Sequence, residues 1–254
     1  MTKQRLDVAM TERGLTSTRS QAESWIKMGK VTVDNRVMMK PGLFVRPDSI
    51  IKLTAEDQYV SRAGLKLASV AKLLKLDFRD KIVLDVGSST GGFTDYSLRN
   101  GAKKVYAVDV GTDQLHPSLQ GHKQIELHEK TDIRDVVVGK WVAGDGNQGK
   151  VYIADHPDIV LIDVSFISLR DVLPHIYQLL LPHSQVVAMV KPQFEAGKDQ
   201  TNKGIIKNDA MRRQILKDFE LWAKNLFVIV DKRDSDVAGA KGNQERFYLL
   251  KLSK

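Results

Sequence analysis

The sequence contains no cysteine among its 254 residues. This absence excludes disulfide frameworks, cysteine-ligated zinc and iron–sulfur clusters. It also excludes every reaction that needs a thiolate nucleophile. The chemistry of the protein must therefore depend on other side chains.

Long apolar runs are also missing. No stretch approaches the roughly 20 apolar residues that a helix needs to cross a bilayer, and the first turns of the chain lack the apolar core of a secretory signal. We therefore expect a cytoplasmic protein with no membrane partner. The histidines show no metal-ligand spacing, so we also expect no metal.

The charged residues are plentiful and unbalanced. Lysine and arginine number 39 against 31 acidic residues, a formal net charge of +8, and 42% of the residues are hydrophobic. That composition is ordinary for a folded globular protein. The positive balance favours a polyanionic partner such as nucleic acid, although an excess of this size also occurs in proteins that bind nothing acidic.

A polar segment at residues 55–60 separates two differently patterned parts, which we take as domains 1–57 and 58–254. In the first part, Thr18 is expected to cap a helix that ends at Gly29, with Gln21 completing a capping box. Short alternating segments then surround a turn at Asp34 and Asn35. The pattern predicts a small α+β domain of two helices and a short sheet.

The second part has short apolar runs separated by segments of helix length. Several runs are apolar at consecutive positions, as in parallel strands covered on both faces. We expect an α/β, doubly wound domain with a mostly parallel seven-stranded sheet, whose ligand lies beyond the carboxyl ends of the strands. The expected strands are 81–86, 104–110, 125–128, 158–164, 186–191, 226–230 and 246–252.

The turn after the first of these strands, residues 85–94, is rich in glycine. It is not a P-loop, because Phe93 stands where the lysine is required, and its spacing is not that of a dinucleotide fingerprint. Asp109, at the end of the next strand, could accept both hydroxyls of a ribose, while Asp85 favours an ammonium group directly or through water. These features favour S-adenosylmethionine over NAD, with a turn that binds no ligand as the remaining alternative.

The absence of cysteine also narrows the choice of atom that receives the methyl group. It excludes a cytosine-C5 methylase, which uses a thiolate. Residues 163–166 differ from the Asn/Asp-Pro-Pro-aromatic signature of many amino methylases, so an oxygen acceptor is the better candidate. A lysine can remove a hydroxyl proton if its pKa is lowered from about 10.4. Lys191 and Asp163 end adjacent expected strands and should project into one crevice, although a solvent-facing lysine and a helix cap are the alternatives.

In combination, five segments resemble the TlyA family, also labelled hemolysin A. They are residues 17–22, 59–67, 85–95, 163–169 and 191–195. The resemblance covers essentially the whole chain. It implies a small RNA-binding domain of the ribosomal-protein-S-four type followed by an FtsJ-like, Rossmann-like class I methyltransferase domain. The implied reaction is transfer of a methyl group from S-adenosyl-L-methionine to a ribose 2′-hydroxyl of cytidine or another nucleotide in ribosomal RNA.

The resemblance also assigns site residues. The FtsJ-like catalytic tetrad matches Lys66, Asp163, Lys191 and Glu245, with Lys191 acting on the 2′-hydroxyl and the others positioning it and the ribose. Asp132 stands where the family usually has an asparagine that contacts adenine, and a carboxylate can still accept from the adenine amino group. The expected donor-binding residues are Asp85, Gly87, Ser88, Gly91, Gly92, Phe93, Asp109, Val110, Asp132, Ile133 and Asp163.

Basic residues are expected to contact phosphates of ribosomal RNA or ribosomal subunits without reading sequence. These are Arg5, Arg19, Lys27, Lys30 and Arg62. Two charged or glycine-rich segments, 143–150 and 197–208, are interpreted as surface loops, the second either ordering over RNA or remaining solvated. A non-catalytic RNA-binding protein, a small-molecule methyltransferase and a membrane-active hemolysin remain as alternative functions.

Overall fold

The computed structural model describes most of the chain. The described residues are 3–16, 18–27, 29–54, 59–140, 149–197, 201–202, 205–206, 208–237, 239 and 242–253. The expected loops at 143–150 and 197–208 therefore lie largely outside the described residues, as does most of the segment at 55–60.

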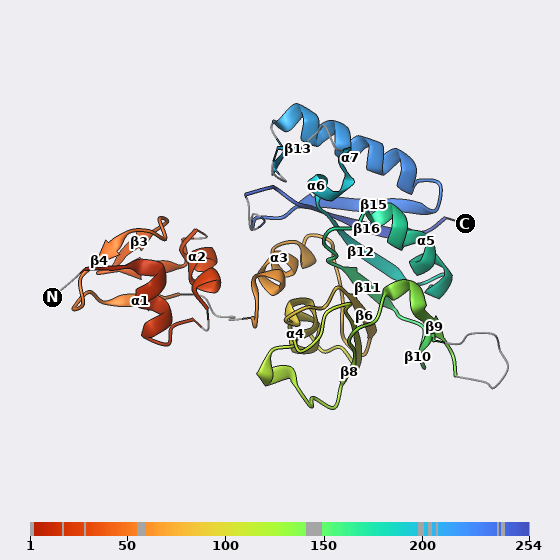
Figure 1. The fold of residues 1–254 in the computed structure, drawn as a ribbon, viewed down its shortest axis with the longest axis horizontal. Coiled ribbons are helices and arrows are strands. Elements are labelled where there is room, and N and C mark those ends of the chain that lie inside the picture. The colour runs from red at the N-terminus through yellow and green to blue at the C-terminus, as the bar shows by residue number, and fades with distance from the viewer. Residues whose placement is uncertain are drawn as a thin grey trace.

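The N-terminal part pairs two short helices with short antiparallel strands (Figure 1). The central strand β2 (Val31–Val33) lies between its neighbours in the order β3-β2-β5, and a second pair, β1 with β4, holds the chain end. The expected two helices and short sheet are present, while β1 and β4 carried no recognisable pattern. The remaining elements are β1 (Gln4–Arg5), α1 (Leu6–Glu12), α2 (Arg19–Lys27), β3 (Arg36–Met38), β4 (Phe44–Val45) and β5 (Ile51–Leu53).

The boundaries of α2 follow the expected end signals at both ends. The Thr18 hydroxyl accepts from the backbone N–H of Gln21 at 3.2 Å, as an N-cap does. At the other end, Gly29 has φ +69°, and its backbone N–H donates to the Ile26 carbonyl. The Gln21 side chain donates to the Tyr59 carbonyl at 2.6 Å, so this residue links α2 to the segment that enters the second domain.

The second part contains the expected doubly wound sheet, with strand order β15-β16-β12-β11-β6-β7-β8. Only β16 runs antiparallel to its neighbours. All seven expected strands are present. They are β6 (Ile82–Val86), β7 (Lys104–Val108), β8 (Ile125–His128), β11 (Ile159–Ile162), β12 (Gln185–Val190), β15 (Phe227–Asp234) and β16 (Arg246–Leu252).

Helices cover both faces of this sheet, which explains the consecutive apolar positions of its strands. Alternate strand residues enter two cores: one packs against α3 (Arg62–Ala71) and α4 (Gly92–Arg99), the other against α5 (Leu169–Leu179) and α7 (Asp209–Ala223). In β11, for example, Leu161 belongs to the first core and Val160 to the second. Burial on both faces fixes the register, because a one-residue shift would exchange the two sets.

The shorter elements lie in the connections between the sheet strands. The strands β9 (Val136–Val138) and β10 (Val151–Ile153) pair in parallel, which the sequence pattern did not indicate. The other short elements are η1 (Pro117–Leu119), η2 (Ile133–Asp135), α6 (Pro192–Glu195), β13 (Thr201–Asn202) and β14 (Ile205–Ile206). The connections after β6, β7, β11 and β12 all begin at the carboxyl edge of the sheet, where the candidate site is found.

Candidate active site

The glycine-rich turn after β6 brings backbone close to the neighbouring strand ends. Gly87 has φ +80° and donates its N–H to the Val108 carbonyl at 2.9 Å. A Cβ atom at Gly87 would lie 2.8 Å from the Asp163 carbonyl oxygen. Gly91, with φ +85°, is the N-cap of α4. Glycine is therefore required at Gly87 by both backbone conformation and space.

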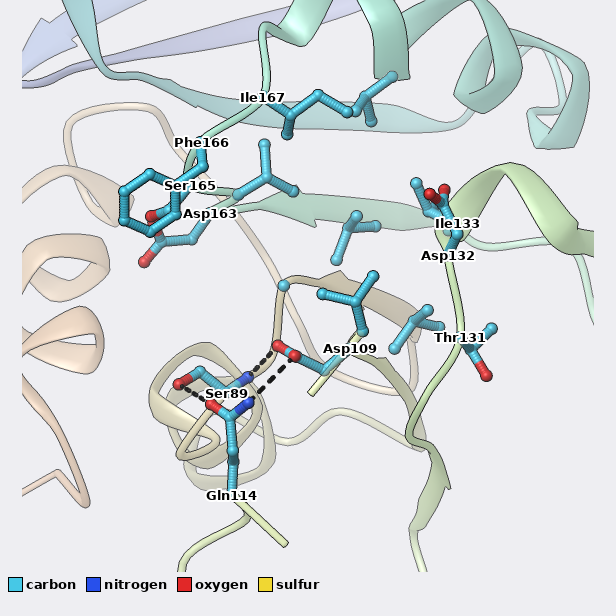
Figure 2. Close-up of a pocket in the computed structure, with 16 residues that line it drawn as sticks. Ser89, Asp109, Gln114, Thr131, Asp132, Ile133, Asp163, Ser165, Phe166 and Ile167 are labelled. Atoms are coloured by element: carbon cyan, nitrogen blue, oxygen red, sulfur yellow. Dashed lines mark hydrogen bonds between the residues drawn. The ribbon is translucent and has the colours of Figure 1, made fainter. Parts of the chain in front are cut away.

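A cavity of about 380 Å³ opens beside this turn, a volume suited to a small-molecule ligand (Figure 2). Figure 2 shows Asp163 and Phe166 on one side of this larger cavity and Thr131 and Asp132 on the other. Its lining includes the expected residues Gly87, Asp109, Val110, Asp132, Ile133 and Asp163. It also includes residues that the sequence analysis did not single out, among them Ser89, Gln114, Thr131 and Phe166.

Asp109 is anchored at the edge of the larger cavity by N–H donors. Its carboxylate accepts from the backbone of Ser89 at 2.8 Å and from Nε2 of Gln114 at 3.4 Å (Figure 2). It also accepts from the backbone of Gly111 at 2.7 Å. A carboxylate has about four lone-pair sites, so acceptor capacity remains for a ligand hydroxyl. The binding of a ribose at Asp109 stays a prediction.

Asp132 caps the short helix η2 and pairs with Arg134. One carboxylate oxygen accepts from the Arg134 backbone N–H at 2.9 Å, and the other accepts from its Nη2 at 2.6 Å. The Arg134 guanidinium holds the pKa of Asp132 below its usual value. An adenine amino group at Asp132 would therefore share a carboxylate that already has a cationic partner, and this contact stays a prediction.

A smaller cavity of about 170 Å³ adjoins the first, and the two share Gly87, Ser89, Asp163 and Ser165. Asp85, Ser88, Phe93 and Lys191 also line it. Among the described residues, Oδ1 of Asp85 and Oγ of Ser88 are buried with no hydrogen-bond partner. Buried polar atoms are normally satisfied, so a polar ligand group is expected here, and Asp85 Oδ1 and Ser88 Oγ can both accept from N–H donors.

The burial of Asp85 changes its acidity. Its Oδ2 accepts from the Thr94 hydroxyl at 2.6 Å. Burial raises the pKa of Asp85 to about 7, and the nearby carboxylate of Asp163 contributes to the rise. An ammonium group beside Oδ1 would stabilise the ionised form. The smaller cavity could thus hold the ammonium end of a ligand such as S-adenosylmethionine, and the larger one has room for a nucleoside.

Lys191 and Asp163 form the ion pair where the two cavities meet. Lys191 Nζ lies 2.6 Å from Asp163 Oδ1 and donates to Ser165 Oγ at 2.7 Å. The side chains are 10% and 15% exposed, so the pair is largely shielded but still open to the cavity. These residues were predicted to end adjacent strands, and β11 and β12 are indeed neighbours.

Lys66 and Glu245 form a second, more buried ion pair. Lys66 on α3 lies 2.5 Å from the Glu245 carboxylate, just before β16, and Glu245 is only 3% exposed. Neither residue lines the two cavities, although Ala63 on the same turn of α3 lines the smaller one. The structure thus joins the four predicted tetrad residues as two pairs.

The remaining predicted donor residues lie in or beside the turn. Phe93 is 2% exposed and lines the smaller cavity, while Val110 is 71% exposed at the larger one. Gly91 and Gly92 shape the start of α4 and do not line either cavity.

Phe166 is the functional candidate that the sequence analysis missed. It is 91% exposed, has φ +66° and lies 5.2 Å from the Phe194 ring. An aromatic side chain at a strand end, three residues after Asp163, was the signal that could have identified it.

The basic residues proposed for RNA differ in their surroundings. Arg5 and Arg19 both pair with Asp7, whose side chain is fully buried, and Arg5 leads in holding the pKa of Asp7 at about 2. Lys27 pairs with Glu23 at 3.8 Å. Lys30 is exposed, and Arg62 is half-buried at the start of α3.

No group of three histidine, aspartate or glutamate side chains within the described ranges is arranged to hold a metal ion. In the same part of the chain, every helix is too short or too polar to cross a membrane.

Comparisons with known proteins cover both parts of the chain. Residues 59–252 match the FtsJ-like methyltransferase family, and residues 4–51 match the S4 domain. Hemolysin A of Brachyspira hyodysenteriae is 35% identical over 95% of this chain and 97% of its own length. The Mycobacterium tuberculosis protein named 16S/23S rRNA (cytidine-2'-O)-methyltransferase TlyA is 32% identical over 97% of this chain and 89% of its own.

A solved structure from Streptococcus thermophilus, described as a hemolysin, is also similar. It covers 100% of this chain and 90% of its own, with 37% identity and a TM-score of 0.69.

Proposed function

The chain belongs to the FtsJ-like methyltransferase family, among the TlyA or hemolysin A proteins, and we propose that it methylates ribose 2′-hydroxyls of cytidine in ribosomal RNA. Relatives named as rRNA (cytidine-2'-O)-methyltransferases support the reaction and the acceptor. The observation that carries the proposal is the Lys191–Asp163 ion pair at the junction of the two cavities.

The donor is S-adenosylmethionine, which when bound supplies an electrophilic methyl group on a sulfonium sulfur. Asp109 would accept from a hydroxyl of its ribose, and the buried oxygens of Asp85 and Ser88 would hold its ammonium group. Asp163 lines both cavities, so its carboxylate adds negative charge near the position of the sulfonium. No metal is needed for this reaction.

Lys191 is the residue that acts on the acceptor hydroxyl. Alkylation of a hydroxyl requires that its proton be removed or polarised. Lys191 Nζ is the amine at the smaller cavity, and it accepts that proton in its neutral form, after giving up its own. Asp163 and Ser165 hold this nitrogen at 2.6 and 2.7 Å, so its direction is fixed before the substrate arrives. The Lys66–Glu245 pair, between α3 and the start of β16, would position the ribose.

Phe166 offers a surface for the acceptor base. Single-stranded or extruded RNA bases are commonly stacked on aromatic side chains, at about 1–3 kcal/mol per base. Phe166 is exposed beside Asp163 (Figure 2), and its contact with Phe194 limits how the ring can turn. We assign it to stacking on the target base, with the positively charged N-terminal domain contributing phosphate contacts.

Methyl transfer from labelled S-adenosylmethionine to purified 30S subunits, 50S subunits and intact ribosomes tests the proposal. Native protein should label RNA at a nucleotide that resists alkaline cleavage, because a 2′-O-methyl group blocks that reaction. Lys191→Ala should reduce the rate by about 10³-fold, within the range for loss of a general base. Donor binding without label on any particle would instead indicate a non-catalytic RNA-binding protein.

A further inference from the structure

Glu195, at the end of α6, reaches from the Lys191 connection to the Asp163 connection. Its Oε2 accepts from the Ser168 hydroxyl at 2.7 Å, and its Oε1 accepts from the Leu169 backbone N–H at 2.7 Å. Ser168 and Leu169 follow Asp163 by only a few residues, and Glu195 follows Lys191 by four. The two segments that carry the central ion pair are therefore joined a second time by this carboxylate.

The Glu195 carboxylate is buried and fixed by its neighbours. Its side chain is only 1% exposed, and Arg170 Nε lies 3.8 Å away. Burial raises its pKa above the usual value, while the Ser168 and Leu169 donors oppose that rise. In both hydrogen bonds a carboxylate oxygen of Glu195 is the acceptor, so the ionised carboxylate satisfies both donors.

A second contact joins the same two segments, beside the hydrogen bonds of Glu195. Phe194, the neighbour of Glu195, packs its ring 5.2 Å from Phe166, and Lys191 Nζ lies 6.0 Å from the Phe194 ring. The short helix α6 thus contacts the segment after β11 through one apolar and one charged side chain. Phe166 has φ +66°, an uncommon conformation for an aromatic residue that its surroundings must hold.

We propose that Glu195 is a positioning residue, which clamps the segment after β11 to the segment after β12 and thereby holds Asp163, Lys191 and Phe166 in one arrangement. This inference rests on the proposed function, because it assigns the clamp to the methyl-transfer site. Misplacement of reacting groups by about 1 Å can cost up to a hundredfold in rate.

A simple helix-capping role does not account for these contacts. Helix α5 already has an N-cap, because the Ser168 hydroxyl accepts from the Arg170 backbone N–H at 3.1 Å. Glu195, in a different segment of the chain, accepts from that same hydroxyl and from the preceding backbone N–H, that of Leu169. The contact therefore restrains two segments relative to each other as well as completing the helix end.

Three substitutions of Glu195 distinguish the effect of its side-chain length from the effect of its negative charge. Glu195→Ala removes both contacts. Glu195→Gln keeps the length and one acceptor oxygen, so it should retain the Leu169 contact. Glu195→Asp keeps the charge but is one methylene shorter, so it should lose both. A clamp predicts the rate order Glu, then Gln, then Asp and Ala together, whereas a role of charge alone predicts that Asp exceeds Gln.

The matched control is Asp158→Ala. Asp158 also accepts from a backbone N–H, that of Ile82 at 2.9 Å, but at the amino end of β6, away from the site. Single-turnover methyl transfer, donor affinity, RNA affinity and melting temperature are measured for the full-length proteins. Glu195→Ala should lower the single-turnover rate at saturating RNA about tenfold or more, with donor affinity within about twofold of native, while Asp158→Ala changes stability only.

Three results are informative. The predicted rate order with retained donor affinity supports the clamp. Native rates in all Glu195 variants, or rates and affinities that fall together with stability as in a general folding defect, overturn it. Failure of the native protein to transfer methyl to any particle contradicts the proposed function itself, so the two failures are distinguishable.

Discussion

The two halves of the carboxyl edge are built in different ways. The donor half, after β6 and β7, holds its key carboxylate with nearby N–H donors: Asp109 is fixed by the backbone of Ser89 and Gly111. The acceptor half, after β11 and β12 and before β16, is built from ion pairs between distant residues, Lys191 with Asp163 and Lys66 with Glu245. Backbone donors make a preformed binding surface, whereas paired side chains provide groups that can exchange protons.

Gly87 lies where the donor half meets the acceptor half, so its substitution should disturb both halves. Gly87→Ala would place a Cβ 2.8 Å from the Asp163 carbonyl oxygen and strain a residue at φ +80°. Strain and displaced backbone together should weaken donor binding about a hundredfold, equivalent to about 2.7 kcal/mol. Calorimetric titration with S-adenosylmethionine measures this, and methyl transfer at saturating donor should also fall.

Gly121→Ala provides the matched control. Gly121 also has positive φ, at +70°, but a Cβ there would meet nothing within 4 Å. This variant should lose stability while keeping donor affinity near the native value. Equal donor affinities in the two variants would show that the close approach of Gly87 to Asp163 is unimportant.

Asp85 should make the donor half sensitive to pH. Its pKa is raised to about 7, so it is mostly protonated at pH 6 and mostly ionised at pH 8. Only the ionised form attracts the ammonium group, so donor affinity should rise by about tenfold between these values. Titrations of native protein and Asp85→Asn across this range test the prediction: the variant should bind more weakly with a flat profile, and an equally flat native profile would refute it.

The N-terminal domain should affect neither half directly. Lys30→Ala should weaken RNA binding only a few-fold and reduce the salt slope by about 1, as loss of one phosphate contact does. Donor affinity and the maximum rate should not change. Arg5→Ala should instead destabilise the domain, because it removes a partner of the buried Asp7. Salt-dependent RNA binding and thermal unfolding separate the two effects.

The same contrast explains what could be predicted from the sequence. The donor turn lies within residues 85–94, directly after a strand, so its glycines and Asp85 could be identified from local spacing. The seven strands were recognisable because helices cover both faces and the runs are apolar throughout. Lys66 and Glu245 are 179 residues apart, and only the family resemblance connected them.

Contacts that depend on side-chain packing could not be predicted. No local pattern indicates that Gln21 reaches the Tyr59 carbonyl, that Asp7 engages both Arg5 and Arg19, or that Glu195 bonds Ser168. The parallel pairing of β9 with β10 was missed because two three-residue strands carry too little periodicity. Such features follow from the assembled fold.

The central claim is that the donor half binds and the acceptor half performs the chemistry. The most direct test measures S-adenosylmethionine affinity and single-turnover methyl transfer to ribosomal subunits for native protein, Asp109→Ala and Lys191→Ala. Lys191→Ala should bind donor within about threefold of native but transfer about 10³-fold more slowly, whereas Asp109→Ala should lose about tenfold in affinity and regain most of its rate at saturating donor. Loss of donor affinity in Lys191→Ala in proportion to its rate, or native affinity in Asp109→Ala, would contradict the account.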